Sequence, residues 1–367
     1  MARAGRGDAA AGLRPRDRAA AGAFRARPPC ADGVRSVAPG PDGLSVGRRG
    51  DRGSWNTGPR CDAVSAMAHH ASLGRVGIWA SALRTDDAAR RPLVEEAAAE
   101  LDELGYGTLW IGGSPSPDMA QRLLAATSRA TVGTSILNIW EHAAVEVAAR
   151  HAQLTDEYGG RFLLGLGVSH AETRSGHALD HPLAGRPRSA MRSYLDTLDN
   201  APRPVPAAGR ALAALGPKML QLAAERSLGA LPYLVTVEHT AEARDILGAD
   251  PLLAPELKVV LQRPGADPAA AYATARDYLS RYLALANYRH SLLRLGFAES
   301  DFDGGGSDRL VDALFAIGDA EAVRAKADSF LAAGADHVAL QVVTAATGTD
   351  LPREEWRALA AAMPLRD

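Results

Sequence analysis

The sequence predicts a (β/α)8 barrel, an α/β fold, and three observations support this prediction. Short apolar segments recur along the chain without alternating polar residues, as the strands of a parallel sheet buried on both faces require. Segments with helical spacing of apolar residues separate them. A glycine repeatedly follows such a segment, where it supplies the left-handed helix cap. Eight units of this kind within residues 73–364 favour a closed barrel over a doubly wound sheet.

Residues 1–70 differ from the rest of the chain. They are rich in Ala, Arg, Gly, Pro and Asp and have no hydrophobic period. Such a segment buries too little apolar surface to offset the entropy lost on folding, so we expect a disordered extension. The acidic residues and the lack of an apolar core region argue against a targeting peptide. A start of translation at Met67 is an alternative interpretation, and the barrel domain is expected over residues 71–367.

The predicted elements follow in regular order. Pro92 stands in the first turn of the first outer helix, which ends at Gly105. The next helices are expected at residues 118–129 and 144–158. Residues 263–318 are more than two strands need to be connected, and their periodicity predicts a helical insertion after the seventh strand. The eight strands are expected at residues 73–81, 106–113, 131–140, 161–167, 212–216, 229–236, 257–262 and 337–343.

Composition excludes several functional classes. A net charge of −2 predicts no general affinity for nucleic acid or acidic membranes, and no apolar stretch is long enough to span a bilayer. Cys30 and Cys61 suggest neither a disulfide framework nor a zinc site, so a reducing cytoplasm is expected. No cluster of residues has metal-ligand spacing, and neither a P-loop nor a nucleophile elbow occurs.

The segment GLGVSH at residues 165–170 has two interpretations that imply different cofactors. Its G-x-G spacing is that of a dinucleotide-binding loop, but His170 stands where such a loop has its third glycine. Three strand–helix units precede it, whereas the dinucleotide fingerprint usually belongs to the first unit. The favoured interpretation is the carboxyl end of the fourth barrel strand, the face on which barrels carry their active sites.

Residues 132–140, 148–172 and 212–240 together resemble the luciferase-like monooxygenase superfamily. The similarity is greatest to its branch that depends on the deazaflavin coenzyme F420. This resemblance implies a TIM barrel with a helical insertion after strand seven, and commonly a homodimer. It also implies an oxidoreductase that transfers a hydride between coenzyme F420 and a small organic substrate. An FMN-dependent monooxygenase that uses dioxygen, or a barrel that binds a flavin without catalysis, is an alternative.

The resemblance assigns the cofactor to two parts of the chain. A bulge with a non-prolyl cis peptide lies behind the ring in this family and corresponds to Ser135-Ile136, where an ordinary buried strand is the alternative. The phosphate corresponds to residues 216–219, because a helix N-terminus attracts anions. Lys218 adds a charge if it points inward, and is otherwise solvated. The expected cofactor-binding residues are Ser135, Ile136, Asn138, Gly167, Val168, Gly216, Pro217, Lys218 and Met219.

His170 and Ser114 are the expected catalytic residues. The sugar dehydrogenases of the F420-dependent branch carry a glutamate at the position of His170, and a histidine also transfers protons near neutral pH, with a structural role as the alternative. This departure puts a sugar-phosphate substrate in doubt. Trp79 and Thr236 are expected in the substrate pocket, with packing in the barrel mouth as the alternative for Trp79. The glycines at residues 112–113 leave room for a ring.

Glu141 and His142 follow the third strand closely. Their position before a helical segment predicts helix-cap residues rather than site residues.

Overall fold

The computed structural model describes residues 72–169, 181–346 and 348–365, and every strand pair in this part is parallel. Neighbouring strands follow one another around the sheet in chain order, and the last strand returns to the first. The strands in this order are β1 (Val76–Ala80), β2 (Thr108–Gly112), β3 (Thr131–Ser135), β5 (Phe162–Gly167), β6 (Arg210–Leu212), β7 (Gly229–Ala230), β8 (Leu252–Leu253), β9 (Glu256–Leu261) and β11 (Val338–Val342), with β4 (Leu137–Asn138) beside β5.

Strand seven closes the barrel in two pieces. β8 pairs with β7, and β9 begins after a break of two residues and pairs with β11. Hydrogen bonds continue through the break, because the Ala254 N–H donates to the Ala230 carbonyl and the Ala339 N–H to the Pro255 carbonyl, both at 3.0 Å. The predicted (β/α)8 barrel is therefore confirmed.

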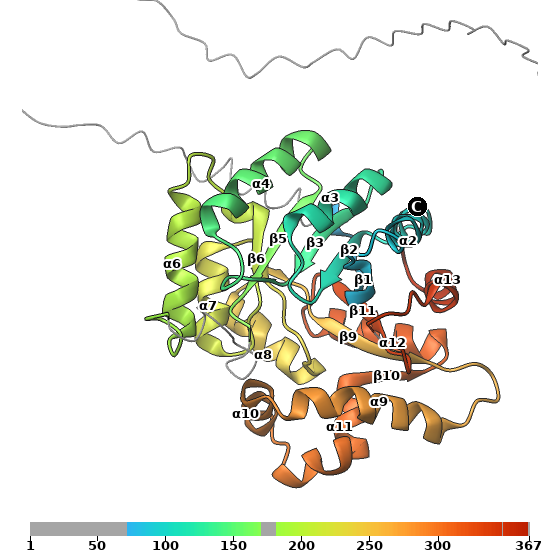
Figure 1. The fold of residues 1–367 in the computed structure, drawn as a ribbon. Helices are drawn as coiled ribbons and strands as arrows, with labels where there is room; N and C mark the ends of the chain where they lie inside the picture. Colours follow the sequence, from blue (N-terminus) through green and yellow to red (C-terminus); the bar gives the residue numbers. More distant parts are fainter. Residues whose placement is uncertain (1–71, 170–180, 347, 366–367) are drawn as a thin grey trace, which may run out of the picture. The chain divides into compact units, whose positions relative to one another are not determined.

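Helices surround the sheet (Figure 1). They end where glycine permits it, as at Gly159, whose φ of 63° is the left-handed cap predicted after the 144–158 segment. They are α2 (Arg91–Glu103), α3 (Pro117–Ala126), α4 (Ala144–Tyr158), α6 (Pro187–Asp199), α7 (Pro217–Arg226), α8 (Val237–Leu247), α12 (Ala320–Ala332) and α13 (Arg353–Ala362), with short 3-10 turns η1 (Ser81–Leu83) and η3 (Ala207–Gly209).

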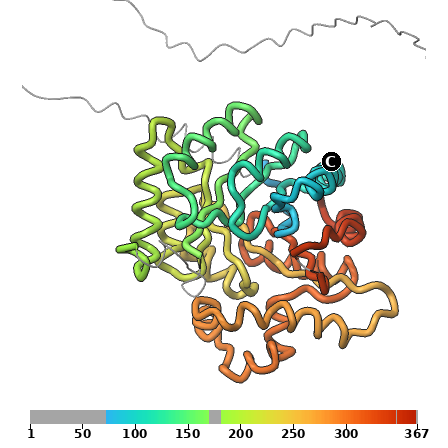
Figure 2. The backbone as a smooth tube through the Cα atoms, in the orientation of Figure 1, coloured from blue at the N-terminus to red at the C-terminus, as the bar shows by residue number. Residues whose placement is uncertain are grey.

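The predicted insertion forms a lobe with its own apolar core, coloured orange in Figure 2. Leu279, Leu292 and Leu310 are buried in this core. The lobe also contains a strand that the sequence did not predict, because β10 is only four residues long and follows α11 without a turn. Its elements are α9 (Pro268–Leu283), α10 (Ala286–Arg294), η4 (Glu299–Gly305), α11 (Asp308–Leu314) and β10 (Phe315–Gly318), the last of which pairs with β9.

Two predicted strands are wrong in their extent. The strand expected at residues 229–236 is only β7, and the chain leaves the ladder after Ala230. The strand expected at residues 212–216 is β6, which ends at Leu212. In both cases the residues beyond the ladder are apolar loops on the barrel rim, and apolar composition alone does not separate such loops from strands.

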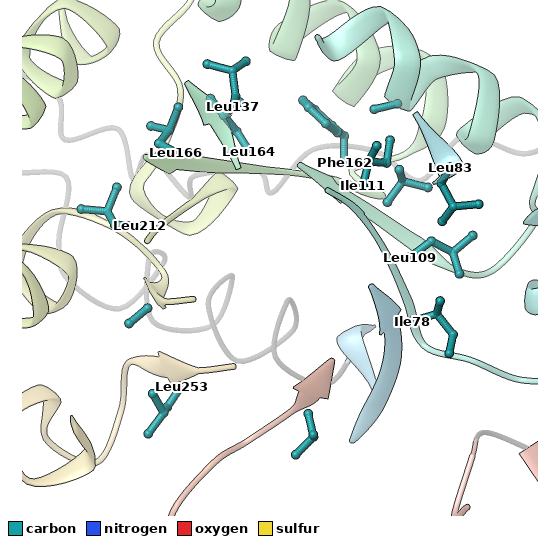
Figure 3. Close-up of a cluster of buried hydrophobic side chains, with 14 of the residues drawn as sticks. Ile78, Leu83, Leu109, Ile111, Leu137, Phe162, Leu164, Leu166, Leu212 and Leu253 are labelled. Atoms are coloured by element: carbon teal, nitrogen blue, oxygen red, sulfur yellow. The ribbon is translucent and has the colours of Figure 1, made fainter. Parts of the chain in front are cut away.

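Apolar side chains fill both sides of the sheet. Figure 3 shows the outer layer, in which residues such as Ile78, Leu109 and Phe162 point from the strands toward the helices. The barrel interior contains larger groups, among them Trp110 and His337. The Trp110 indole N–H donates to His337 Nε2 at 3.0 Å, so the polar atoms of this interior pair are satisfied.

Asp102 joins the end of α2 to the turn that precedes β3. Its buried carboxylate accepts hydrogen bonds from the backbone N–H groups of Ser128, Arg129 and Ala130 and from the Ser128 hydroxyl. Burial on its own would raise the pKa of Asp102, but the hydrogen bonds from Ser128 and Ala130 lower it below its usual value.

Asp102→Asn is expected to lower the free energy of unfolding by about 2 kcal/mol at neutral pH, because an amide NH2 would face backbone donors. The folded-state pKa is depressed, so this stabilisation is complete above the unfolded pKa of about 4 and is lost as pH falls through the folded value. Urea denaturation of both proteins across this range should show the difference shrinking in acid. Glu103→Gln, at an exposed neighbour, is the control. A difference independent of pH would contradict the assignment.

Candidate functional site

A cavity of about 690 Å³ lies at the carboxyl ends of the strands. Each strand end contributes a short stretch to its lining, which is where parallel barrels carry their active sites. The insertion contributes the junction of α9 and α10. The residues lining the cavity are Trp79, Gly113, Ser114, Ser135, Ile136, Asn138, Glu141, Gly167, Val168, Ser169, Pro187, Ala213, Ala214, Leu215, Gly216, Met219, Leu231, Tyr233, Tyr282, Ala286, Asn287, Tyr288 and His290.

Most of the predicted site residues come together in this cavity. Pro217, Lys218 and Thr236 do not line it: Lys218 is exposed, and Thr236 is buried as the cap of α8, where its hydroxyl accepts from the His239 N–H at 3.2 Å. His170 lies outside the described residues. Those that do line it are Trp79, Ser114, Ser135, Ile136, Asn138, Gly167, Val168, Gly216 and Met219, and their functional roles stay predictions.

The floor of the cavity is formed where β3 passes into β4. The Ser135-Ile136 peptide bond is cis, which is the isomer that the resemblance implies. Ile136 packs directly onto Gly167 at the end of β5, because a Cβ added at Gly167 would lie 2.4 Å from Ile136 Cδ1. A glycine is therefore required at residue 167 for the Ile136 side chain to lie against the strand.

Three polar side chains form a network at the cavity rim. The Ser114 hydroxyl donates to Glu141 Oε2 at 2.6 Å, and the Asn138 amide donates to Glu141 Oε1 at 2.7 Å. The Asn138 backbone N–H donates to Ser114 Oγ at 3.3 Å. Ser114 adopts a left-handed backbone conformation with φ of 53°. The carboxylate thus holds both polar neighbours in place.

Glu141 is a site residue that sequence reasoning missed. The expectation that it caps a helix is wrong, because α4 begins at Ala144 and no side chain caps it. The signal that was available is its spacing, three residues after Asn138, in a segment that leaves the end of a strand.

The N-terminus of α7 opens onto the cavity. Gly216 is its N-cap, and a Cβ added there would meet no atom within 4 Å. Pro217 has no N–H, and the Met219 N–H donates to the Gly216 carbonyl at 3.0 Å, so the Lys218 N–H is the donor left in this first turn. Helix N-termini of this kind favour anions.

Two side chains hold the turn before α7. The Leu215 carbonyl accepts from His239 Nε2 at 2.9 Å and from the Arg294 guanidinium at 3.3 Å. Burial lowers the pKa of His239, and the hydrogen bond to Leu215 raises it only in part. A neutral His239 with its proton on Nε2 therefore fits this geometry, and Arg294 brings a positive charge close to the N-terminus of α7.

A buried ion pair supports the cavity from β9. Lys258 Nζ lies 2.6 Å from Glu256 Oε2 and 3.8 Å from the centre of the Tyr233 ring. Burial raises the pKa of Glu256 and lowers that of Lys258, and their mutual attraction offsets part of both effects. Both groups lie beneath the lining, so they fix Tyr233 in place.

Other kinds of site are not seen in the described residues. These contain no group of three or more His, Cys, Asp or Glu side chains placed to hold a metal ion. Among the same residues, no helix combines the length and the apolar composition that crossing a bilayer requires.

Residues 74–196 match the family model of the luciferase-like monooxygenases. The predicted resemblance is thereby confirmed for this part of the chain. A comparison with curated protein sequences gives no match.

Solved structures with the same fold include enzymes that use different cofactors. An F420-dependent secondary alcohol dehydrogenase in complex with an F420–acetone adduct is 15% identical, with a TM-score of 0.58 over 78% of this chain and 99% of that one. The oxygenating constituent of 3,6-diketocamphane monooxygenase from Pseudomonas putida, in complex with FMN, is 15% identical, with a TM-score of 0.56 over 78% and 96%. The coenzyme F420-dependent tetrahydromethanopterin reductase from Methanopyrus kandleri is 17% identical, with a TM-score of 0.53 over 79% and 97%. At these identities the likeness establishes the fold.

The room that Gly112 leaves is filled by the indole of Trp79. A Cβ added at Gly112 would lie 2.4 Å from Trp79 Cη2 and Cζ2. The expectation that this glycine makes room for a ring is met by a ring of the protein itself, and Trp79 is both packed in the barrel mouth and part of the cavity lining.

Gly112→Ala is therefore expected to lower the free energy of unfolding by about 1–3 kcal/mol through overpacking against Trp79. In a Trp79→Phe background the same change should cost less, because the smaller ring lacks the atoms that the new methyl group contacts. A double-mutant cycle measured by urea denaturation checks this coupling. Costs that simply add would contradict the proposed packing.

Proposed function

We propose that the chain is an oxidoreductase that binds coenzyme F420 across the carboxyl ends of the barrel strands and transfers a hydride between it and a small organic substrate. The observation that supports this most directly is the continuity of one cavity, which extends from the cis-bonded floor at Ser135-Ile136 to the open N-terminus of α7. These are the two positions that the family resemblance assigns to the ring and the phosphate. The F420-dependent enzymes with this fold add support.

The residues present fit such a cofactor. The cavity volume of about 690 Å³ lies in the range of sites for ligands of this size. Ile136 and Val168 offer an apolar surface for a flat ring. At Gly216, the space that a Cβ would fill is open, and the Lys218 N–H with the helix dipole suits a phosphate oxygen. Arg294 adds a positive charge near this end.

The cofactor, when bound, supplies the two-electron chemistry. The chain binds and orients both partners, and its apolar lining excludes water from between them. Ser114 and Glu141 handle a proton in this proposal: a proton accepted at Ser114 Oγ is balanced by the proton that the hydroxyl gives to Glu141 Oε2, 2.6 Å away. His170 remains a predicted second acid or base. A homodimer in the cytoplasm, which the resemblance implies, is part of the same proposal.

Titration of the purified apoprotein with coenzyme F420 and, separately, with FMN tests the choice of cofactor. We expect F420 to quench protein fluorescence saturably at lower concentration than FMN. Steady-state assays against alcohols, imines and enones should then show consumption of one cofactor redox form. Tight FMN binding without F420 binding would indicate the monooxygenase alternative. Binding without turnover of any substrate would indicate a non-catalytic barrel.

Gly216→Ala is expected to weaken cofactor binding about tenfold or more without changing stability. Its φ of −99° suits any residue and no atom crowds the new methyl group, but that group occupies the space beside the helix N-terminus. Fluorescence titration and thermal unfolding measure the two effects. Gly185→Ala, also uncrowded and outside the lining, is the matched control, and Lys218→Ala should change affinity much less because its side chain is exposed. Unchanged affinity in the Gly216 variant would refute this phosphate position.

Ser114→Ala and Glu141→Gln are both expected to lower kcat by about a hundredfold, the order expected for loss of an acid–base group. Cofactor affinity should stay within about twofold, because neither change enlarges or blocks the floor. Steady-state kinetics and cofactor titration separate the effects. An unaltered kcat in both variants would remove this pair from the mechanism.

A further inference from the structure

Four aromatic side chains form one continuous part of the cavity lining, called here the aromatic wall. They are Trp79 at the end of β1, Tyr233 after β7, and Tyr282 and Tyr288 from the insertion. The ring centres of Trp79 and Tyr233 are 5.4 Å apart, those of Tyr233 and Tyr282 5.5 Å, and those of Tyr282 and Tyr288 5.7 Å. These separations are those of packed aromatic pairs, so the four rings act as a single surface.

The aromatic wall is fixed in position before any ligand arrives. The Tyr233 hydroxyl is 2.8 Å from that of Tyr278, donates to Tyr282 or Gln341 at 3.0 Å, and ties the insertion to β11. Gln341 in turn donates to the Tyr278 hydroxyl at 2.6 Å. The Lys258 ammonium contacts the Tyr233 ring. A site pre-organised in this way loses little entropy when it binds a rigid, flat molecule.

The charges around the aromatic wall select against anions. The cavity lining in the described part of the chain contains no Lys or Arg, and its carboxylate is Glu141. Lys258 lies beneath Tyr233, but Glu256 already neutralises it. A substrate carboxylate or phosphate beside this wall would therefore lose its hydration without gaining a cationic partner, which is costly in a partly buried site.

The wall contains one donor that the protein leaves unused. Trp79 is 7% exposed, and its indole N–H has no hydrogen-bond partner. A buried donor without a partner is unfavourable, and a ligand acceptor that pairs with it relieves this cost. An aromatic surface alone would accept any apolar molecule, whereas this donor favours one that carries an acceptor atom.

We propose that the aromatic wall is the substrate subsite, and that it takes an uncharged, flat, unsaturated carbonyl compound whose oxygen accepts the Trp79 indole N–H. The substrate class is thus an aryl ketone or cyclic enone rather than a sugar phosphate or a carboxylate. The inference rests on the proposed function for the reaction that follows, but binding at the wall is measurable without turnover.

Calorimetric titration with three matched probes tests the proposal on the full-length protein, with and without bound coenzyme F420. Acetophenone has the ring and the acceptor, ethylbenzene lacks the acceptor, and 4-acetylbenzoate adds a negative charge. The wild-type protein should bind acetophenone, and should bind 4-acetylbenzoate at least about tenfold more weakly. Equal or tighter binding of the charged probe, or no binding of acetophenone, would overturn the proposal.

Two variants separate the donor from the aromatic surface. Trp79→Phe keeps a ring and removes the N–H, so it should weaken acetophenone about fivefold and leave ethylbenzene unchanged. Tyr282→Ala should weaken both probes, whereas Tyr272→Ala should weaken neither, because Tyr272 is a tyrosine of the insertion that bonds to Asp312 outside the lining. Equal losses of both probes in Trp79→Phe would overturn the role of the indole donor, and unchanged binding in Tyr282→Ala would overturn the subsite.

Cofactor titration of the same variants keeps the two proposals distinct. Coenzyme F420 that fails to bind while the probes behave as expected would refute the proposed function and leave the subsite in place. Normal cofactor binding with probes that ignore both variants would refute the subsite alone. Thermal unfolding of each variant identifies any that fails to fold, in which case Tyr282→Leu replaces Tyr282→Ala.

Discussion

The close approach of large side chains to glycine backbone is the constraint on which the barrel interior depends. Trp110 lies against Gly133 on the next strand, and Trp79 lies against Gly112 in the same way, since an added Cβ would come within 2.5 Å of either ring. Ile136 repeats the arrangement at Gly167. A parallel barrel has a narrow interior, so a tryptophan fits only if the neighbouring strand gives up its side chain. The same exchange creates the cavity mouth: near the rim the ring faces the space in which we propose that a ligand binds.

Strand seven connects this packing to the insertion. Its break at residues 254–255 lets β8 serve one neighbour and β9 the other, and β9 then carries Glu256 and Lys258. A buried ion pair of this kind adds little net stability, because desolvation offsets most of the attraction. What it does here is geometric. Lys258 fixes the Tyr233 ring, and the Tyr233 hydroxyl fixes the insertion, so the barrel core and the distant lobe share one rigid contact.

The sequence predicts the elements of this fold better than their ends or their mutual contacts. Strands of a parallel sheet are apolar on both faces, and a glycine closes the preceding helix, so both signals are local. The end of a strand depends on whether its neighbour still offers a partner, which is why β7 is so much shorter than the apolar run that contains it. Ser114 and Asn138 follow strand ends and were expected. Glu141 and Tyr282 were not, because their place in the lining depends on segments far away in the chain.

The cavity differs chemically between its two ends, and this difference bears on the direction in which a ligand lies. At one end, the N-terminus of α7 and the Arg294 guanidinium favour negative charge. At the other, rings surround a space without a cation, and Trp79 offers a single neutral donor. A cofactor with a flat ring and an anionic tail gains from both ends in only one orientation, with its tail on α7. That orientation leaves the ring between the Ile136 floor and the aromatic wall, so the substrate's chemistry is constrained by the barrel's aromatic packing.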